Sequence, residues 1–290
     1  KAVILATEGY QGLWNNFAEG PGTGIALAVS AGVKLEGMSN IPKHKLTVRG
    51  TNLHLPIDIL SMGGRYRTES GEDMLPGENI SEEGCILDLR SLNSDAKIWY
   101  AQTIRRIEER TGLDTSLDVI PLMESVAFTL GGAPVDSDGR VTFKSESMWF
   151  TGLYAAGRSA NTGMHGDGYL SGNLQLEDLV TGEAAGNHAG NWSKTMRFGG
   201  SEKISKELTK VSKTISKYYS PNGESVGEIS KKISTAARNL NSNNNLVLSS
   251  VKELKSTQIS LTDDSKVMNT ELLHAMQANA MCSILESIAK

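Results

Sequence analysis

One stretch of the chain, residues 152–186, combines residue types that could bind a flat or anionic ligand. Residues 153–156 are apolar and predict a buried strand that stops at Gly157, and residues 171–185 carry leucines and a valine at helical spacing. Glycines at positions 163, 166 and 168 lie between the two. Glycine lets a backbone approach a ligand closely, and a helix N-terminus offers free N–H groups. The pattern therefore favours a binding site, although a strand-to-helix turn that is close-packed for structural reasons would look similar.

This stretch resembles the last FAD-binding segment of the flavoprotein subunits of succinate dehydrogenase and fumarate reductase, a family that includes L-aspartate oxidase. The family pattern is a GLYAAGE strand end, then HGxNRLGGNSLLE, then a helix. The residues that match are Gly152 to Gly157, His165, Gly166, Leu170, Gly172, Asn173, Leu176 and Glu177. The resemblance implies FAD as the cofactor, and it implies cofactor-binding roles for Ala6, Thr7, Gly131, Gly132, Gly157, Arg158, His165, Gly172, Asn173, Leu174 and Leu176.

The opening of the chain resembles a later part of the same FAD domain. The apolar residues 2–5 predict a central strand of a parallel sheet, and the segment Lys-Ala-Val-Ile-Leu-Ala-Thr is similar to the family pattern KAVILATGG. No glycine-rich GxGxxG unit comes before it in this sequence. The resemblance therefore implies that another polypeptide completes the FAD domain, and residues 2–5 are expected to lie beside an open or foreign neighbour.

Residues 39–130 are similar to the family's capping domain, which closes over the substrate. The family reaction is hydride transfer between a dicarboxylate and FAD, with electrons passed to an iron–sulfur partner, and its substrate contacts are two histidines and two arginines. Ile41, Ala127 and Tyr169 stand at three of those four positions, and the helix with the fourth, a proton-donating arginine, is missing. His44 is the one nearby candidate for a catalytic role, although a lone histidine is commonly a plain loop residue. The alternative is a non-catalytic structural or assembly paralogue, a pseudoenzyme.

The rest of the chain is predicted from periodicity and turn signals. Residues 95–110 predict one helix with Ile98, Ile104 and Ile107 facing a core, and Asp138-Gly139 predicts a hairpin. Four helices are expected over 201–219, 226–240, 246–259 and 269–289. The fold class is therefore α/β plus α: a remainder of a Rossmann-like FAD-binding domain (1–38 and 131–190), an inserted capping domain (39–130) and a C-terminal helical bundle (191–290).

Composition and charge limit the kinds of partner that this chain could bind. The 290 residues carry a net charge of −4, with acidic residues in excess before position 188 and basic residues in excess after it. The C-terminal lysines are scattered and no aromatics interleave with them, which argues against nucleic-acid binding. No apolar run is long enough to span a membrane and no signal peptide is visible, so the resemblance implies a cytoplasmic-side protein, peripheral to a membrane complex. Cys85 and Cys282 are far apart, which predicts reduced thiols without an iron–sulfur or other metal site.

Overall fold

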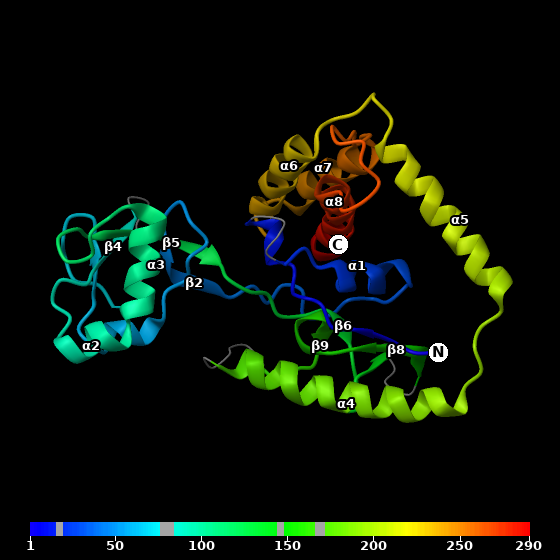
Figure 1. The fold of residues 1–290 in the computed structure, drawn as a ribbon, viewed down its shortest axis with the longest axis horizontal. Helices are drawn as coiled ribbons and strands as arrows, with labels where there is room; N and C mark the ends of the chain where they lie inside the picture. The colour runs from blue at the N-terminus through cyan, green and yellow to red at the C-terminus, as the bar shows by residue number, and fades with distance from the viewer. Residues whose placement is uncertain (16–19, 76–83, 144–147, 166–171) are drawn as a thin grey trace. The chain divides into compact units, whose positions relative to one another are not determined.

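The computed structural model describes residues 1–15, 20–75, 84–143, 148–165 and 172–290, which fall into two compact units (Figure 1). The first unit joins Lys1–Pro42 to Phe128–Lys290, and the second is Lys43–Ala127. The chain therefore leaves the first unit once and returns to it once. The helices and strands make a mixed α/β fold.

The first unit is built on a three-stranded sheet with the order β1-β8-β7. Strand β1 (Val3–Leu5) pairs in parallel with β8 (Trp149–Ala155), and β7 (Arg140–Thr142) pairs with β8 antiparallel. Strands form at both predicted positions, 2–5 and 153–156, but among the described residues β1 lies at the edge of the sheet and not at its centre. The Asp138-Gly139 hairpin is confirmed, because Val135 bridges Val141 across it. A short parallel pair, β6 (Ala133–Pro134) with β9 (Ala160–Asn161), lies beside the sheet.

Two helices cover this sheet from opposite sides (Figure 1). Helix α1 (Thr23–Ser30) buries Ala28 against Leu5 and Ala155. Helix α4 (Asn173–Thr195) packs Ala185 and Ala189 on Tyr154 and Ala156. Helix α4 continues well past the predicted end and through three glycines, because these tertiary contacts outweigh a helix cost of about 1 kcal/mol for each glycine.

The apolar stripe predicted for the start of α4 does not face the sheet. Leu176, Leu179 and Val180 are 50%, 70% and 46% exposed, respectively, whereas Glu177 is only 3% exposed. The sheet-facing side of α4 instead follows a four-residue spacing through Glu177, Thr181, Ala185 and Ala189. Small and polar residues, and not the leucines, therefore form the buried face of α4.

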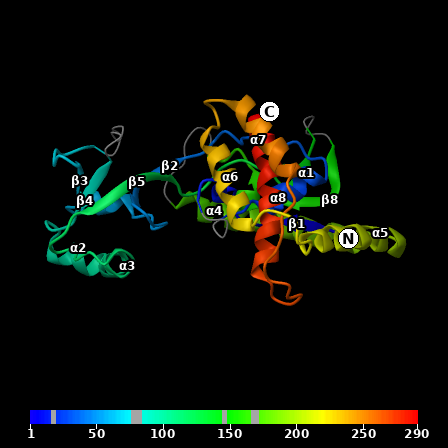
Figure 2. The same cartoon turned by 90° about the horizontal axis from the view of Figure 1, so that it is seen from above.

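The C-terminal part of the first unit is a helical bundle of α5 (Ser201–Tyr218), α6 (Val226–Arg238), α7 (Asn244–Ser256) and α8 (Thr270–Ala289). Figure 2 shows α6, α7 and α8 packed together. Side-chain caps begin three of the helices, on Ser225, Asn243 and Asn269. The bundle core includes Ile229, Ile233, Val247, Val251, Ala275, Met281 and Leu285.

Two bundle helices differ from the predicted faces. In α8 the apolar positions Leu273, Met276 and Ile284 were expected along one side; Ile284 is buried, but Leu273 and Met276 are 53% and 44% exposed, and Ala275, Ala278 and Cys282 are buried as well. In α5 the apolar residues at helical spacing, Ile204, Leu208 and Val211, are 49–63% exposed, and Tyr218 is the buried residue of that helix. The small residues of α8 face the core because they let α6 and α7 approach closely.

The second unit is an antiparallel sheet with the order β2-β5-β4-β3, accompanied by two helices. The strands are β2 (Lys43–Val48), β3 (Arg65–Thr68), β4 (Cys85–Asp88) and β5 (Ile120–Val126), and the helices are α2 (Ser94–Trp99) and α3 (Ala101–Thr111). One helix was predicted over 95–110. The structure ends α2 at Tyr100, which is buried, and so exposes Ile98 at 75% while Ile107 stays in the core.

Short 3-10 turns complete the described elements, at Gln11–Leu13, Ile57–Leu60 and Gly157–Ser159. Cys85 and Cys282 are both buried free thiols, as predicted. Across the described ranges, no helix is long and apolar enough to cross a bilayer, and no cluster of three or more metal-ligating side chains occurs.

Candidate functional site

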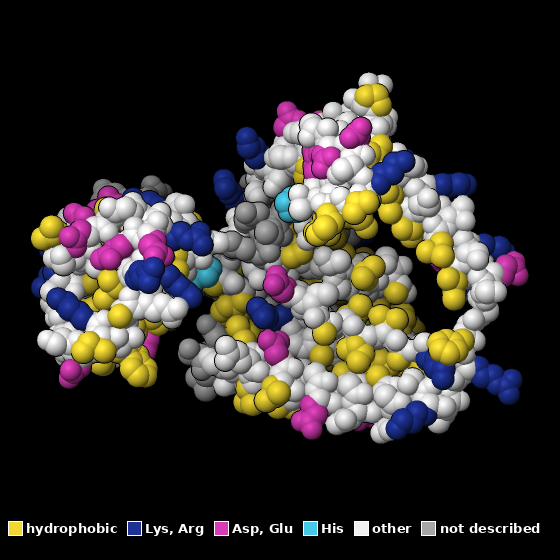
Figure 3. Space-filling model, viewed as in Figure 1, with side chains coloured by type: hydrophobic (Ala, Val, Ile, Leu, Met, Phe, Trp, Pro, Cys, Tyr) yellow, Lys and Arg dark blue, Asp and Glu magenta, His cyan; other side chains and the backbone are white. Residues whose placement is uncertain are grey.

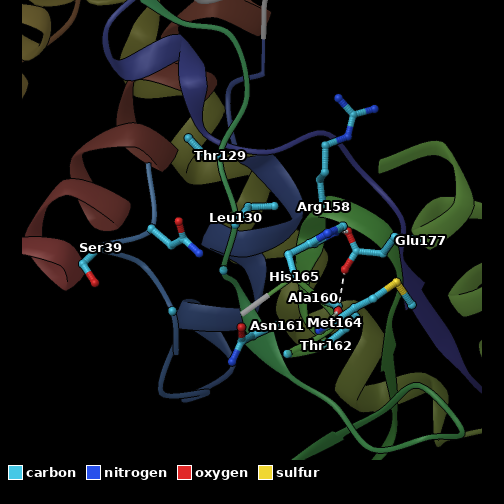
Figure 4. Close-up of a pocket in the computed structure, with 14 residues that line it drawn as sticks. Ser39, Thr129, Leu130, Arg158, Ala160, Asn161, Thr162, Met164, His165 and Glu177 are labelled. Carbon is cyan, nitrogen blue, oxygen red and sulfur yellow. Dashed lines mark hydrogen bonds and ion pairs between the residues drawn. The ribbon is translucent and has the colours of Figure 1, made fainter. Parts of the chain in front are cut away.

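A cavity of about 480 Å³ lies within the first unit, where three stretches of the chain meet (Figure 4). Residues 37–40, 129–131 and 158–165 form its walls, and Glu177 reaches it from α4. The lining is mostly polar, with Asn40, Asn161 and Thr162 offering amide and hydroxyl groups. Such groups can form directional hydrogen bonds to a heteroaromatic or carboxylate ligand.

A buried hydrogen-bonded cluster forms one side of this cavity. The Glu177 carboxylate lies 2.9 Å from Nε2 of His165 and accepts a 2.5 Å hydrogen bond from the Thr162 hydroxyl. The His165 and Glu177 side chains are 6% and 4% exposed. Since an ionised carboxylate only accepts hydrogen bonds, Nε2 of His165 carries the hydrogen. The cluster therefore fixes both the orientation and the tautomer of His165.

A second cavity of about 300 Å³ lies at the carboxyl ends of β1 and β8. Ala6, Thr7, Gly157 and Arg158 line it, and Asp178 of α4 lies opposite. Arg158 also lines the first cavity, so the two share one side chain. Figure 4 shows the Arg158 side chain extending away from the His165–Glu177 pair. Its guanidinium lies 3.5 Å from the Asp178 carboxylate.

Backbone geometry at two glycines brings these segments together. Gly157 has φ +55°, and a Cβ there would lie 2.3 Å from Oδ1 of Asp178. Gly131 has φ +96°, and a Cβ there would lie 2.4 Å from the Gly37 backbone. A larger residue would be strained at either position, because a left-handed backbone and a close approach are both required. Both glycines are therefore needed to shape the walls of the cavities.

Hydrogen bonds fix the chain segments that line the second cavity. The Thr7 N–H donates to Oγ of Ser159 at 2.9 Å, and that hydroxyl donates back to the Thr7 carbonyl at 2.8 Å. The Gly157 N–H donates to the Thr181 hydroxyl at 2.8 Å, and Thr181 donates to the Glu177 carbonyl at 2.6 Å. The end of β1, the end of β8 and the first turns of α4 are thereby fixed to one another.

The structure brings together six of the predicted cofactor-binding residues. Arg158 lines both cavities, and the others divide between them: Ala6, Thr7 and Gly157 around the second, and Gly131 and His165 around the first. Residues from positions near 6, 131 and 160 thus converge, although they are distant in the sequence.

The other predicted residues are placed differently. The N–H of Gly132 donates to Glu36 and its carbonyl accepts from Glu36, both at 3.0 Å, so Gly132 joins two chain segments. Gly172 is the left-handed N-cap of α4. It is followed by Asn173, Leu174 and Leu176, and none of these four is among the described residues that line the two cavities. Residues 166–171, which include Gly166, Tyr169 and Leu170, lie outside the described residues.

Sequence reasoning did not assign Glu177, Asn161, Thr162 or Asp178 to the site. A signal for Glu177 was present, since Glu177, Thr181, Ala185 and Ala189 recur every four residues, as expected for one helix face. The leucines at neighbouring positions obscure this four-residue pattern in the sequence. Asn161 and Thr162 follow a glycine turn and carry no pattern of their own.

His44, the predicted catalytic candidate, lies in the second unit on β2. Its Nε2 is 2.8 Å from the Leu55 carbonyl oxygen, and its ring meets that of His54 edge-on at 5.5 Å. Nδ1 of His54 lies 2.9 Å from the Thr47 hydroxyl. Burial lowers the pKa of His44, and burial together with the nearby His44 lowers the pKa of His54 to about 4. These contacts describe a neutral histidine pair that joins β2 to its neighbouring loop.

Because of this histidine pair, we expect the second unit to lose folding stability in acid. An unfolded histidine has a pKa near 6.5 and the folded His54 has a lower one, so the unfolded state binds more protons as the pH falls from about 6.5 towards 4. The contribution of His54 to the stability of the folded state is fully present above about pH 6.5 and is lost as the pH falls towards 4. Because the ring is partly exposed, we expect His54 to account for only about 1–2 kcal/mol.

Hydrogen exchange of β2 and β5 at pH 7 and pH 5, corrected for intrinsic rates, measures this loss. His54→Asn keeps a partner for Thr47 and should reduce the difference between the two pH values. His274→Asn, in α8 of the other unit, should leave that difference unchanged. An equal pH dependence in the wild type and His54→Asn would contradict the prediction.

Comparison with known proteins gives three findings. Residues 87–174 match the family described as FAD binding domain. L-aspartate oxidase of Pyrococcus horikoshii is 28% identical over 200 residues, which cover 62% of this chain and 41% of that protein. L-aspartate oxidase of Mycobacterium leprae is 28% identical over 219 residues, covering 65% and 40%. Together with the flavoprotein relatives, the domain match supports FAD as the cofactor.

Solved structures share the fold. The E. coli quinol fumarate reductase chain FrdA superposes with a TM-score of 0.82 at 20% identity, over 99% of this chain and 57% of that one. Mycobacterium smegmatis Sdh1 gives 0.78 at 22% identity, over 99% and 53%. The chain thus spans about two fifths of the curated relatives and little more than half of these structural neighbours.

Proposed function

Since this chain belongs to the flavoprotein family of succinate dehydrogenase, fumarate reductase and L-aspartate oxidase, we propose that its two cavities hold part of an FAD molecule. The observation that carries the proposal is the convergence of Ala6, Thr7, Gly131, Gly157 and His165 around Arg158. These residues come from three segments that are distant in the sequence and that all resemble cofactor-binding segments of the family.

The residues present offer the cofactor one cation and several hydrogen-bonding groups, beside the carboxylates of Glu8 and Asp178 in the second cavity. Arg158 is the one lysine or arginine among the described residues lining either cavity, and it suits the anionic diphosphate of FAD. The missing Cβ of Gly157 lets Asp178 of α4 approach the end of β8 closely, which sets the wall of the second cavity. His165, Asn161 and Thr162 offer hydrogen bonds to a flavin ring in the first cavity. The flavin, when bound, supplies hydride-transfer chemistry, and these residues bind and orient it.

We assign residues 43–127 to a capping domain and the sheet with α1 and α4 to the remainder of a Rossmann-like FAD domain. This assignment rests on the single excursion of the chain out of the first unit and on the fold shared with fumarate reductase. By family relationship, the protein would transfer hydride between a dicarboxylate and FAD and pass electrons to an iron–sulfur partner, peripheral to a membrane complex.

A second candidate function is a non-catalytic structural or assembly paralogue, and one observation favours it. A dicarboxylate needs cations or strong donors at both ends. Ile41, at a family histidine position, packs against the bundle core, and Ala127 has no donor in its side chain. Of the described residues lining the first cavity, Arg158 is the only lysine or arginine. We therefore propose that the family fold and cofactor site are retained and that dicarboxylate catalysis is lost.

FAD titration tests the first proposal, with flavin fluorescence as the readout. We expect saturable 1:1 binding, and Arg158→Gln should weaken it about ten-fold, which corresponds to about 1.4 kcal/mol. Arg105→Gln, an exposed arginine of α3, is the matched control and should bind as the wild type does. Absence of saturable flavin binding by the folded chain would overturn the proposal.

A further inference from the structure

A cavity of about 420 Å³ lies on the second unit beside helix α3. Helix α3 and the loop that follows β2 supply its lining residues, which are Arg106, Glu109 and Arg110, and Asn52 and Leu53. Figure 3 shows Lys and Arg side chains, with some acidic ones among them, on the face of the second unit that α3 forms. Among the described residues, this cavity shares no lining residue with the two cavities around Arg158.

Two arginines of this cavity differ from the other arginines of the second unit. That unit contains seven, and five of them form ion pairs with Asp or Glu: Arg49, Arg65, Arg67, Arg90 and Arg105. Within the described ranges, Arg106 and Arg110 have no such partner. They are four residues apart on one helix, so they lie side by side. Like charges at this spacing destabilise a helix, and an anion bound between them removes that cost.

The end of helix α3 does not use these two arginines as caps. Basic side chains near a helix C-terminus can donate hydrogen bonds to its last carbonyl groups. Here the N–H of Gly112 donates to the Glu108 carbonyl at 2.8 Å, and the Thr111 hydroxyl donates to the Ile107 carbonyl at 2.7 Å. Both carbonyls are therefore satisfied without either arginine.

The walls of the cavity are fixed by the fold. Ile107 is fully buried and anchors α3 in the core of the second unit. In the loop, the Val48 N–H donates to the Leu53 carbonyl at 2.9 Å, and the Leu53 N–H donates to the Thr51 hydroxyl at 3.0 Å. Leu53 packs against the same core. Asn52 is exposed between these fixed residues, so its amide is held beside the two arginines.

One carboxylate also lines the cavity, and it has a cation of its own. Glu109 Oε1 accepts a 2.7 Å hydrogen bond from Nε of Arg105, which is not a lining residue. This ion pair offsets the charge of Glu109, although both side chains are exposed and the offset is therefore partial. With two unpaired guanidinium groups, the cavity keeps a net positive charge.

We propose that this cavity binds the phosphate groups of a small molecule. A guanidinium offers a planar fork of N–H donors that fits two oxygens of a phosphate. A single carboxylate has two oxygens and is satisfied by one such fork, whereas a phosphate has oxygens for both arginines and for the Asn52 amide. Leu53 adds an apolar wall, and the volume lies within the range of about 300–1,000 Å³ typical of small-molecule sites. The proposal is independent of FAD binding in the first unit.

Calorimetric titration of the chain with inorganic pyrophosphate, in low salt and without phosphate buffer, tests this site. We expect saturable binding with a Kd below about 1 mM. Arg106→Gln and Arg110→Gln should each weaken it about ten-fold, because each removes a charged donor. Glu109→Gln should strengthen it about three-fold, because it removes the repelling carboxylate. Arg65→Gln is the matched control, since Asp73 keeps its ion pair with Arg67.

Hydrogen exchange locates the bound anion, and two further ligands identify its source. We expect slower exchange at residues 51–53 and 106–112. Adenosine diphosphate should bind and adenosine should not. A lower Kd for adenosine diphosphate than for pyrophosphate would indicate an organic phosphate as the ligand, and equal values would indicate an inorganic one.

Several results would overturn the proposal. These are a pyrophosphate Kd above about 1 mM, binding that survives both arginine substitutions, and adenosine binding as tightly as adenosine diphosphate. Protection confined to the residues around Arg158 would also overturn it, because the anion would then occupy the cavities proposed for FAD. Absence of flavin binding would leave the phosphate site standing, so the two proposals fail separately.

Discussion

Glu177→Leu is expected to abolish flavin binding and to destabilise the first unit by about 2–3 kcal/mol. The substitution leaves the Thr162 hydroxyl and the His165 ring without their carboxylate partner in a nearly closed site. An orphaned buried polar group costs about 1–3 kcal/mol. His165 would also lose the contact that sets its tautomer, and the wall of the first cavity would lose its fixed arrangement.

Two further variants separate a binding role for Glu177 from a structural one. Glu177→Gln keeps an acceptor for Thr162 and should retain most of the stability, while changing the tautomer of His165 and weakening flavin binding. Glu183→Gln removes an exposed carboxylate from the same helix and should change neither property. Stability is read from urea unfolding and binding from flavin fluorescence. Unchanged flavin affinity in both Glu177 variants would show that the hydrogen-bonded cluster of Glu177, His165 and Thr162 stabilises the fold and does not contribute to flavin binding.

The sequence predicted those elements whose signal is local. The strand ending at Gly157 and the Asp138-Gly139 hairpin were both confirmed, because a glycine and a turn dipeptide each determine the local backbone. The predicted single helix over 95–110 failed for a non-local reason. Burying the Tyr100 ring in the second unit's core turns the chain there and exposes Ile98.

Helices α4 and α8 show where apolar patterns mislead. In α4 the leucines at helical spacing face outward while Ala185 is buried, and in α8 Leu273 and Met276 are exposed while Ala278 is buried. A helix that packs closely needs small residues at the contact, while its leucines can face outward towards something else. Leu179 and Val180 are accordingly 70% and 46% exposed.

The candidate site was predicted in outline and missed in detail. Spacing and resemblance located the glycines and Arg158, because local residue types determine where the backbone turns. The hydrogen bonds of Glu177, and the ion pair of Arg158 with Asp178, join residues 12 to 20 positions apart across a loop. Such pairings depend on how the loop folds, which neither periodicity nor composition specifies.

Turnover of succinate or fumarate is expected to lie at least about a thousand-fold below that of E. coli quinol fumarate reductase, even with FAD bound. Removing one charge-stabilising donor typically costs a factor of about 10²–10³ in rate, and Ile41 and Ala127 offer no donor at two positions where the family has histidine. Tyr169 lies outside the described residues, and its phenol carries no charge to match the family arginine.

Restoring the lost groups provides the decisive comparison. Ala127→His alone and Tyr169→Arg alone should gain little, because groups that act on one substrate as a unit are strongly non-additive. The double variant should raise succinate-dependent reduction of an artificial electron carrier by at least about ten-fold, with flavin content unchanged. Phe198→His, which places the same group at an exposed site, is the control for Ala127→His. Wild-type turnover within about ten-fold of the fumarate reductase rate would contradict the loss of catalysis, because the retained residues would then suffice to hold both carboxylates.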